Sequence, residues 1–396
     1  MNLSRPVFIV SARRTPIGKY LGAFKDVPAV ELGKVAARAA LADAKATPDK
    51  VDLCVIGHAR QAGCGPNPAR QVSVGAGLPH EVPAYTVNQA CASGMRSIAL
   101  AAQEIELGRA HIALAGGMES MTRVPYMIED ARVPRRFGHG TLVDAMYRDG
   151  FLCPLCGQLM GRTAETLAEK YGIAREEQDA YAVETQQRCE RARKRGAFRD
   201  EIVPFDVPAK GGSTRIEADE HPRDGVTAAS MVKLEPVFKE GGTVHPGNAS
   251  GITDGAAALV VASEEGLKRL GASPLARIEA HVTVGVDPAI MGIGPVGATR
   301  RLLEATGGKI DRFDRIEMNE AFAAQVLACD REMHLPRERL NVLGGAIALG
   351  HPIGCTGARV AVTLLHEMRR ENLKRGLATL CVSGGLGIAM SFERQA

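Results

Sequence analysis

The first and last thirds of the chain repeat the same order of features, and this repeat restricts the fold more than any other pattern. A strand-like run is followed by a cysteine that opens a helical pattern, and then by a strand that ends on paired glycines. The matching segments are residues 51–56 and 313–318, residues 91–94 and 355–357, and Gly116-Gly117 and Gly384-Gly385. Such internal similarity indicates a duplicated fold. Because the equivalent helix N-termini of two such halves lie near a common pseudo-axis, we expect both halves to contribute to one site.

Strand-like and helical patterns alternate in both halves. Short apolar runs indicate strands, and apolar residues at three- and four-residue spacing indicate helices. The predicted strands cover residues 7–10, 51–56, 84–87, 112–115, 256–262, 275–284, 315–318 and 378–382. The predicted helices cover residues 30–44, 163–171, 176–195, 296–305, 320–333 and 357–370, and one more begins at Cys91. This alternation predicts an α/β fold with a mainly parallel sheet covered by helices.

Between the two halves, residues 122–247 are rich in Pro, Gly, charge and helical patterns, without strong strand signals. A chain of 396 residues is also too long for one ordinary core. We therefore predict a loop-rich insertion in the first half, of the kind that usually carries substrate contacts. The predicted domains are residues 1–121 with 248–272, the loop domain 122–247, and the C-terminal half 273–396.

The charge balance argues against nucleic acid as a partner. The net charge is +4, which suits an anionic small molecule better than a polyanion. The basic residues within 188–199 lie on a helical pattern without interleaved aromatics, which favours a solvated helix face. No apolar run is long enough to span a membrane, and residues 1–10 lack the features of a secretory or transit segment. We therefore expect a cytoplasmic protein without a membrane span.

The cysteine pattern indicates reduced thiols. The nine cysteines are scattered without the spacing of a disulfide framework. Cys153 and Cys156 form a CxxC motif, but no second pair or nearby histidine completes a zinc site. We expect a packed loop at this motif, and we predict no metal site in the chain.

Cys91 is the first candidate nucleophile. It follows a short apolar run and opens an amphipathic helical pattern, which places it at a helix N-terminus. Unpaired N–H groups and the helix dipole favour the thiolate at such a position, and the thiolate is the nucleophilic form. The simpler interpretation is a buried structural cysteine.

Three further residues carry candidate chemistry. His351 lies in a glycine-rich loop, where backbone and ligand approach closely. Cys381 ends a predicted strand just before a second glycine-rich loop, and Asn319 stands where a strand ends and a helix begins. Each has a simpler interpretation: a solvated loop histidine, an apolar strand residue and a helix N-cap.

Six short motifs occur in the order typical of one enzyme family. They are Asn88-Gln89-Ala90-Cys91-Ala92-Ser93-Gly94, Gly116-Gly117-Met118-Glu119-Ser120-Met121, Asn248-Ala249-Ser250-Gly251, Asn319-Glu320-Ala321-Phe322, Gly350-His351-Pro352 and Cys381-Val382-Ser383-Gly384-Gly385. With these motifs, and from Arg13-Arg14-Thr15-Pro16 almost to the C-terminus, the chain resembles a thiolase. The resemblance implies a thiolase-like fold, two duplicated βαβαβ-type halves with a loop-rich insertion in the first, and acyltransfer between acyl-CoA thioesters.

The resemblance also implies a role for each catalytic candidate. Cys91 would attack a thioester carbonyl and form an acyl-enzyme. His351 would take the thiol proton and polarise the thioester oxygen, together with a water held by Asn319. Cys381 would act as acid and base at the α-carbon of the second substrate. The backbone N–H groups of Cys91 and Ser383 would form another oxyanion hole.

The CoA contacts implied by the resemblance lie mostly in the insertion. Arg223 is expected near the adenine, Ser230 and Ser250 near the pantetheine, Phe238 and Phe322 along the tunnel, and Met160 and Met291 around the acyl group. Ordinary core packing is the alternative for the two methionines. Leu159 replaces a histidine common in short-chain thiolases, and Ser383 replaces a common glycine, so both bear on substrate preference.

The resemblance implies one main functional prediction, acetyl-CoA C-acetyltransferase activity, which joins two acetyl-CoA into acetoacetyl-CoA and CoA or catalyses the reverse thiolysis. CoA is expected as part of substrate and product, with no permanently bound cofactor. The alternative within the family is a 3-ketoacyl-CoA thiolase of fatty acid metabolism with a longer-chain preference. Two remote alternatives are an NAD-dependent dehydrogenase, because residues 292–297 match GxGxxG, and a non-catalytic acyl-CoA or lipid-binding module.

Residues 123–148 are the basis for a prediction of the oligomeric state. This segment is rich in Met, Tyr and Arg, and in short-chain members of the family the equivalent region joins dimers into tetramers. We therefore predict a homotetramer, with an isolated loop as the alternative.

Overall fold

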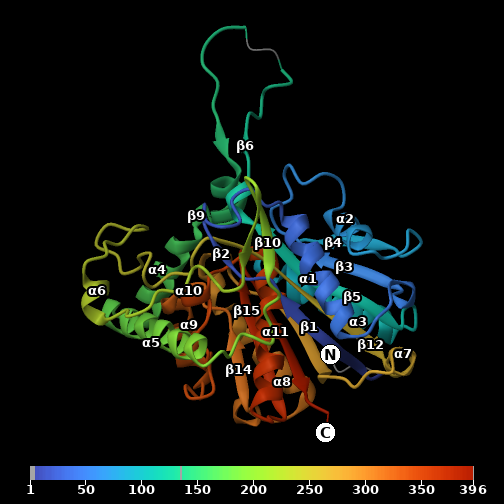
Figure 1. Ribbon diagram of the computed structural model, residues 1–396. Coiled ribbons are helices and arrows are strands. Elements are labelled where there is room, and N and C mark those ends of the chain that lie inside the picture. Colours follow the sequence, from blue (N-terminus) through green and yellow to red (C-terminus); the bar gives the residue numbers. More distant parts are fainter. Residues whose placement is uncertain (1–4, 134–135, 396) are drawn as a thin grey trace.

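The computed structural model describes residues 5–133 and 136–395. Residues 1–4, 134, 135 and 396, which fall within the predicted domains and the predicted assembly segment, lie outside this description. Figure 1 shows a central sheet with helices packed on it, and the predicted α/β class is confirmed. Every predicted helix and strand is present, and the differences lie at their ends.

Strands from both halves of the chain make up one central sheet. The first half supplies β1 (Val7–Arg14), β2 (Gly18–Lys19), β3 (Leu53–Gly57), β4 (Ala84–Val87), β5 (Ile112–Ser120) and β12 (Thr253–Ser263). The second half supplies β13 (Ala276–Gly285), β14 (Arg315–Met318), β15 (Arg375–Val382) and β16 (Leu386–Glu393). Their order is β14-β15-β16-β13-β1-β12-β5-β3-β4, and β2 pairs with the start of β12.

The strand pairing confirms the predicted duplication. In the first half β3 and β5 are parallel, β5 and β12 are antiparallel, and β12 and β1 are antiparallel. In the second half β14 and β15, β15 and β16, and β16 and β13 repeat this sequence of directions. The two halves join through the antiparallel pair β1–β13, at Phe8 opposite Arg277 and Ile9 opposite Ala276.

The prediction of a mainly parallel sheet is wrong, because only the pairs β3–β4, β3–β5 and β14–β15 are parallel among the described strands. β5, β12 and β15 are buried along nearly their whole length. A strand that is covered on both faces has a continuous apolar sequence whatever its direction. The apolar pattern therefore does not show whether β5 and β15 have parallel or antiparallel neighbours. Their neighbours β12 and β16 are antiparallel, and β16 follows β15 directly after a short glycine turn.

The long helices lie in layers on the sheet. α3 (Ser93–Glu106) and α11 (Ile353–Arg370) pack against each other, and residues of both belong to one apolar core with β1, β5 and β15. α1 (Ala29–Asp43) and α2 (Pro68–Gly75) contribute to a second core on the first half. α8 (Gly294–Thr306) and α9 (Ala323–Met333) contribute to a third core on the second half. The shorter helices of the two halves are α7 (Glu264–Leu270) and α10 (Ala346–Leu349).

The insertion lies beside the second half and carries a projecting arm (Figure 1). Its helices are α4 (Met160–Tyr171), α5 (Arg175–Lys194) and α6 (Ala228–Val232). Its strands form small pairs, β6 (Tyr126–Met127) with β7 (Val143–Asp144), β8 (Leu152–Cys153) with β9 (Gln158–Leu159), and β10 (Phe205–Ala209) with β11 (Gly212–Ile216). The arm leaves the body at β6.

Single helical turns connect several of these elements. The 3-10 turns are η1 (Pro48–Lys50), η2 (Ala90–Ala92), η3 (Met121–Arg123), η5 (Pro288–Ile293) and η6 (Ile310–Arg312), and η4 (Tyr147–Phe151) is a π turn. η2 is the one that matters for the site, because it lies between β4 and α3.

Candidate active site

Cys91 lies in a strained turn between β4 and α3. It is the middle residue of η2, and α3 begins two residues later, at Ser93. Ala90 has a φ of 44°, in the left-handed region that residues other than glycine rarely adopt. The Ser93 hydroxyl holds the turn, since Oγ donates to Ala90 O at 2.7 Å and accepts from the Gln89 N–H at 2.9 Å. Cys91 therefore precedes a helix, as predicted, in a position fixed by its neighbours.

Glycines allow the N-terminal ends of α3 and α11 to meet. A Cβ atom on Gly94 would lie 2.6 Å from the backbone nitrogen of Ala358, and one on Gly357 would lie 2.4 Å from that of Met95. Any larger residue at either glycine would push the helices apart. This close packing brings the cysteine turn of one half against the histidine loop of the other.

Glu119, at the end of β5, accepts hydrogen bonds from both halves of the chain. Its Oε2 atom accepts hydrogen bonds from the Ala59 N–H at 3.2 Å and from the Gly354 N–H at 2.9 Å. Its Oε1 atom accepts from the Arg60 N–H at 3.1 Å. The carboxylate is fully buried, and hydrogen bonds to a charged group in such a place are strong. Glu119 belongs to a recognised motif, but its sequence context alone does not predict this role.

A cavity of about 660 Å³ opens between the insertion and the two halves. Four predicted catalytic residues line it: Cys91, His351, Cys381 and Ser383. They come from η2, the loop before α11, the end of β15 and the turn after it. The structure thus brings together residues that are far apart in the sequence, and the thiols of Cys91 and Cys381 are close enough to interact electrostatically.

Burial raises the pKa of the Cys91 thiol above its ordinary value. The backbone N–H groups of Ser383 and of Cys91 itself form hydrogen bonds with the sulfur and act in the opposite direction, as does the charge of Arg60. The prediction of a resting thiolate at Cys91 is therefore wrong, because desolvation outweighs these hydrogen bonds. The resting nucleophile is a thiol that needs a base.

Ser383 stands where a glycine is common in the family, but its backbone does not need the positive φ angle that would favour glycine. Gly384 and Gly385 have positive φ angles, but Ser383 does not. Its N–H therefore points at the Cys91 sulfur without backbone strain. Two backbone N–H groups thus lie beside the sulfur, as the predicted oxyanion hole requires.

His351 is held as a neutral base. The Thr356 hydroxyl donates to Pro352 O at 2.9 Å, so its oxygen is left to accept from His351 Nδ1–H, at 2.6 Å. This places the proton on Nδ1 and leaves Nε2 with a free lone pair. Burial, with smaller contributions from the charges of Arg359 and Arg60, lowers the pKa of His351 to about 3. The imidazole is therefore unprotonated at neutral pH.

These two pKa shifts predict an unusual pH profile for the acylation of Cys91. The His351 base loses its lone pair only near pH 3, and the Cys91 thiol ionises only above its ordinary pKa of 9.0. Both groups keep their reactive forms between these limits. We expect single-turnover acylation rates that stay within about threefold from about pH 6 to about pH 8. A tenfold rise over that range, measured by rapid quench, would instead indicate that the reactive form is a thiolate that appears by titration of Cys91, without proton transfer to His351.

Cys381 is the second thiol of the cavity. It is fully buried and packs with Met160, Met291 and Phe322 in one apolar cluster. Burial first, and then the charge of Cys91, raise the pKa of Cys381 well above its ordinary value. Cys381 is therefore protonated at rest and able to donate a proton.

Asn319 is a buried residue and not the helix N-cap of its simplest interpretation. It is fully buried, and its N–H donates to Thr379 O at 3.0 Å. Helix α9 begins only at Ala323, with Phe322 in the N-cap position, so the N-cap interpretation of Asn319 is wrong. The Nδ2 and Oδ1 atoms make no hydrogen bond to any residue that the structure describes. A buried amide of this kind is typical of a site that binds water or a ligand.

Most of the predicted CoA contacts also line the cavity. They are Arg223, Phe238, Ser250, Phe322, Met160 and Met291. The rings of Phe238 and Phe322 meet edge to face, with centroids 6.3 Å apart. Leu159 lies on the same wall and presents an apolar side chain. Ser230 does not line the cavity, since it is exposed and its hydroxyl donates to Thr227 O at 2.6 Å.

Several cavity residues had no predicted role. His221 lines the cavity, and its Nδ1 atom lies 2.7 Å from Ala348 O. Lys19, Tyr20 and Tyr147 are also on the lining. His221 stands two residues before Arg223, which is the one signal in the sequence that could have indicated it. Lys19 and Arg223 give this lining two cationic side chains, which suit an anionic substrate.

The GxGxxG match at residues 292–297 has a packing function. A Cβ on Gly294 would lie 2.3 Å from Leu386 O, and one on Gly292 would lie 2.6 Å from Leu167 Cδ1. The glycines allow α8 and the turn before it to approach β16 and α4 closely. They leave no open loop for a dinucleotide phosphate, so this motif does not support the dehydrogenase alternative.

Two further predictions concern metals and membranes. In the ranges 5–133 and 136–395, no cluster of three or more His, Cys, Asp or Glu side chains could hold a metal ion. The CxxC motif lies on the β8–β9 hairpin, where Cys156 packs against the cluster that contains Cys153. No helix in the described part of the chain combines the length and the apolar character that a bilayer span needs.

Comparisons with known proteins agree with this architecture. The family models described as thiolase, N-terminal domain, and thiolase, C-terminal domain, match residues 7–265 and 272–394. The chain is 49% identical to an acetyl-CoA acetyltransferase of Pseudomonas aeruginosa, covering 98% of this chain and 99% of that one. It is 48% identical to a probable acetyl-CoA acyltransferase of Staphylococcus aureus, covering 97% and 98%.

Solved structures show the same fold over the full length. The crystal structure of the Bacillus anthracis acetyl-CoA acetyltransferase superposes with a TM-score of 0.97 at 42% identity and covers both chains completely. Human mitochondrial 3-ketoacyl-CoA thiolase superposes with a TM-score of 0.96 at 42% identity, covering 99% of this chain and 100% of that one. Two duplicated halves, an inserted loop domain and two family models that together span nearly all of the sequence lead to one conclusion: the chain belongs to the thiolase family, and is an acyltransferase.

Proposed function

We propose that this thiolase is an acetyl-CoA C-acetyltransferase, which interconverts two acetyl-CoA with acetoacetyl-CoA and CoA. The observation that carries the proposal is the meeting of Cys91, His351 and Cys381 in one cavity. Relatives named acetyl-CoA acetyltransferase, at 46–49% identity over nearly the full chain, support the short-chain substrate. CoA enters and leaves as part of the substrates and is not a resident cofactor.

Acylation is the first half-reaction. Nε2 of His351 accepts the Cys91 proton as the sulfur attacks the thioester carbonyl, which is the role of a general base next to a nucleophile. The N–H groups of Cys91 and Ser383 stabilise the negative charge on the carbonyl oxygen. CoA leaves as the thiol after it takes the proton back from the imidazolium, and an acetyl-cysteine remains.

Carbon–carbon bond formation is the second half-reaction. Cys381, after releasing its own proton to solvent, removes a proton from the methyl group of a second acetyl-CoA, and the resulting enolate attacks the acetyl carbonyl on Cys91. The bond between the acetyl carbon and the Cys91 sulfur then breaks and acetoacetyl-CoA is released. The Cys91 thiolate takes up a proton from solvent and Cys381 keeps the methyl proton, so both thiols are restored. His351 and the buried amide of Asn319, acting through water, would stabilise the enolate oxygen. Acylated Cys91 can no longer ionise, so the charge of a Cys91 thiolate, which raises the pKa of Cys381, does not oppose ionisation of Cys381 in this half-reaction.

The direct test is thiolysis of acetoacetyl-CoA by the purified protein. We expect acetyl-CoA to form from acetoacetyl-CoA and CoA with saturation kinetics of the ping-pong type. Absence of turnover would favour one of the two remote alternatives, a non-catalytic acyl-CoA or lipid-binding module. NADH titration followed by fluorescence should show no binding, and binding would return the dehydrogenase alternative to consideration.

The alternative within the family is a 3-ketoacyl-CoA thiolase with a longer-chain preference. It is supported by the likeness to the human mitochondrial 3-ketoacyl-CoA thiolase, and by Leu159, an apolar residue on the cavity wall. We expect kcat/KM to fall by about tenfold or more from acetoacetyl-CoA to a long-chain 3-ketoacyl-CoA, if the acyl pocket is short. A kcat/KM series over increasing chain length measures this, and a rise along the series would favour the alternative and a place in fatty acid metabolism.

We infer a homotetramer from the projecting arm, residues 123–148. Several large apolar side chains on the described part of the arm are exposed to solvent: Tyr126, Ile128, Val133, Phe137 and Leu142. Such side chains on a projecting segment are typical of a protein–protein contact. Deletion of the arm tip followed by analytical ultracentrifugation would test this, and an unchanged particle mass would contradict it.

A cytoplasmic location and the domain boundaries at 121, 247 and 272 remain predictions.

A further inference from the structure

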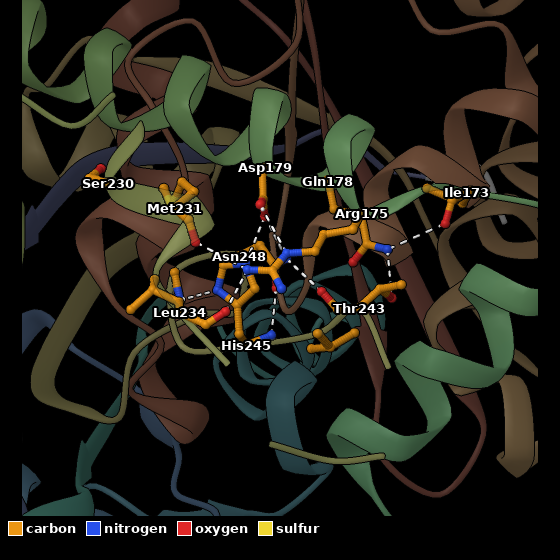
Figure 2. Close-up of polar contacts among 12 residues, drawn as sticks. Ile173, Arg175, Gln178, Asp179, Ser230, Met231, Leu234, Thr243, His245 and Asn248 are labelled. Carbon is orange, nitrogen blue, oxygen red and sulfur yellow. Dashed lines mark hydrogen bonds and ion pairs between the residues drawn. The ribbon is translucent and has the colours of Figure 1, made fainter. Parts of the chain in front are cut away.

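A buried polar cluster behind the cavity takes no part in the mechanism described above. It is formed by Asp179 of α5 together with His245 and Asn248 of the segment that follows α6. His245 and Asn248 are completely buried, and Asp179 is 8% exposed. Figure 2 shows the side chains of Asp179, His245 and Asn248 turned toward one another, with Ser230 at the edge of the view. Burying these polar groups is costly unless each is hydrogen-bonded, so the cluster needs an explanation.

Every polar atom of the His245 ring has a partner. Nδ1 accepts from the Gly247 N–H at 3.1 Å, which leaves the ring proton on Nε2. Nε2 then donates to Asp179 Oδ1 at 2.7 Å. The imidazole thus connects a backbone group of the loop with a carboxylate on helix α5, and its orientation is fixed at both nitrogens.

Asn248 closes the cluster from the other side. Its Nδ2 atom donates to the same Asp179 oxygen at 2.9 Å and to Thr243 O at 3.0 Å, and its Oδ1 atom accepts from the His245 N–H at 2.9 Å. Asp179 is also held on its far side, where Arg175 Nε lies 3.4 Å from Oδ2. The three side chains therefore fix the loop as one rigid unit on α5.

The held loop forms part of the cavity wall. Pro246, Ala249, Ser250 and Gly251 line the cavity. The backbone of the same segment pairs with the loop after β14: the Ala323 N–H donates to Asn248 O at 2.9 Å, and Ala249 forms a β-bridge with Phe322. A shift of the cluster would therefore move two cavity residues, Ser250 and Phe322, that are expected to contact CoA.

We propose that Asp179, His245 and Asn248 are positioning residues that set the CoA-facing wall of the cavity, and that they determine affinity for the CoA moiety rather than the chemistry at Cys91. This inference rests on the proposed function, because it takes CoA as the ligand. None of the three side chains lines the cavity, so they act only through the segment 246–251. A wall displaced by a fraction of an ångström loses contacts along the ligand but leaves the Cys91 turn, which is built on α3 and β4, unchanged. His351 donates its N–H to Gly251 O at 2.9 Å, but the orientation of its ring is fixed by Thr356 and not by this segment.

The test separates the two hydrogen bonds of the imidazole. His245→Phe keeps the ring volume but removes both bonds, whereas His245→Gln keeps a donor toward Asp179. We expect the Kd for CoA, measured by calorimetry, to rise about tenfold in His245→Phe and by less than about threefold in His245→Gln. KM for CoA should follow Kd, with kcat changed by less than about threefold.

A CoA-independent reaction provides the internal comparison. The rate at which iodoacetamide alkylates Cys91 should stay within about twofold of wild type in both variants. His111→Gln is the matched control, because His111 contacts Ser263 far from the cavity, and its Kd for CoA should be unchanged. If His245→Phe fails to fold, Asp179→Asn tests the same contact, with the same rise in Kd expected.

Two results would overturn the proposal. One is an unchanged Kd for CoA in a folded His245→Phe or Asp179→Asn protein, and the other is a kcat or alkylation rate that falls in parallel with affinity. Neither depends on the assigned reaction, since CoA binding is measured without turnover. A wild-type protein that binds CoA but does not cleave acetoacetyl-CoA would contradict the proposed function and leave the positioning role intact.

Discussion

Cys91→Ala is expected to abolish acyl transfer while leaving the fold intact. The substitution removes a cavity sulfur that two backbone N–H groups contact, and no acyl-enzyme can form without it. We expect kcat for acetoacetyl-CoA thiolysis to fall by at least about a thousandfold. CoA should still bind, because the cavity walls supplied by the insertion are unchanged.

The matched control for this variant is Cys54→Ala. Cys54 is another buried thiol of the first half, on β3, and it lies outside the cavity. Its loss leaves a small void that costs about 1 kcal/mol of stability, with turnover close to wild type. Thermal unfolding of both variants shows whether the folds are intact. Normal turnover in folded Cys91→Ala protein would contradict the acyl-enzyme mechanism.

Sequence patterns predicted the convergence of the site but not the sheet that produces it. The cysteine and histidine motifs each precede a glycine-containing helix, and the repeat placed those helices in equivalent positions. The structure confirms this through the contact of α3 with α11. Strand direction could not be predicted, because β5 and β15 are buried along nearly their whole length and their antiparallel partners follow them in the chain at very different distances.

The protonation state of Cys91 also could not be predicted from the sequence around it. The dipole argument considers only the helix that follows the cysteine, whereas the desolvation that dominates its pKa reflects packing against residues distant in the sequence, among them Ala59, Met121 and Ile353. The Asp179, His245 and Asn248 cluster was missed for a similar reason. Asp179 is far from the other two in sequence, and a lone histidine in a loop gives no sign of being buried.

Cys381→Ala is expected to separate the two half-reactions. His351 and the backbone N–H groups around Cys91 remain in place, so acetyl-CoA should still acetylate Cys91. Without Cys381 there is no second thiol to take the α-proton, which is far less acidic than a thiol proton. We expect condensation to fall by at least about a thousandfold, while mass spectrometry of the intact protein detects one acetyl group on Cys91.

Cys381→Ser sharpens the same test, because it restores the size and hydrogen-bonding capacity of the side chain but not its acidity. Burial already holds the pKa of Cys381 well above its ordinary value, and a hydroxyl in the same place would be harder still to ionise. The serine variant should therefore accumulate acetyl-enzyme as the alanine variant does. If neither variant carries the acetyl group, Cys381 is needed for acylation and the division of labour between the two thiols is wrong. If condensation continues in both, another base in the cavity removes the α-proton, and His351 is the residue to substitute next.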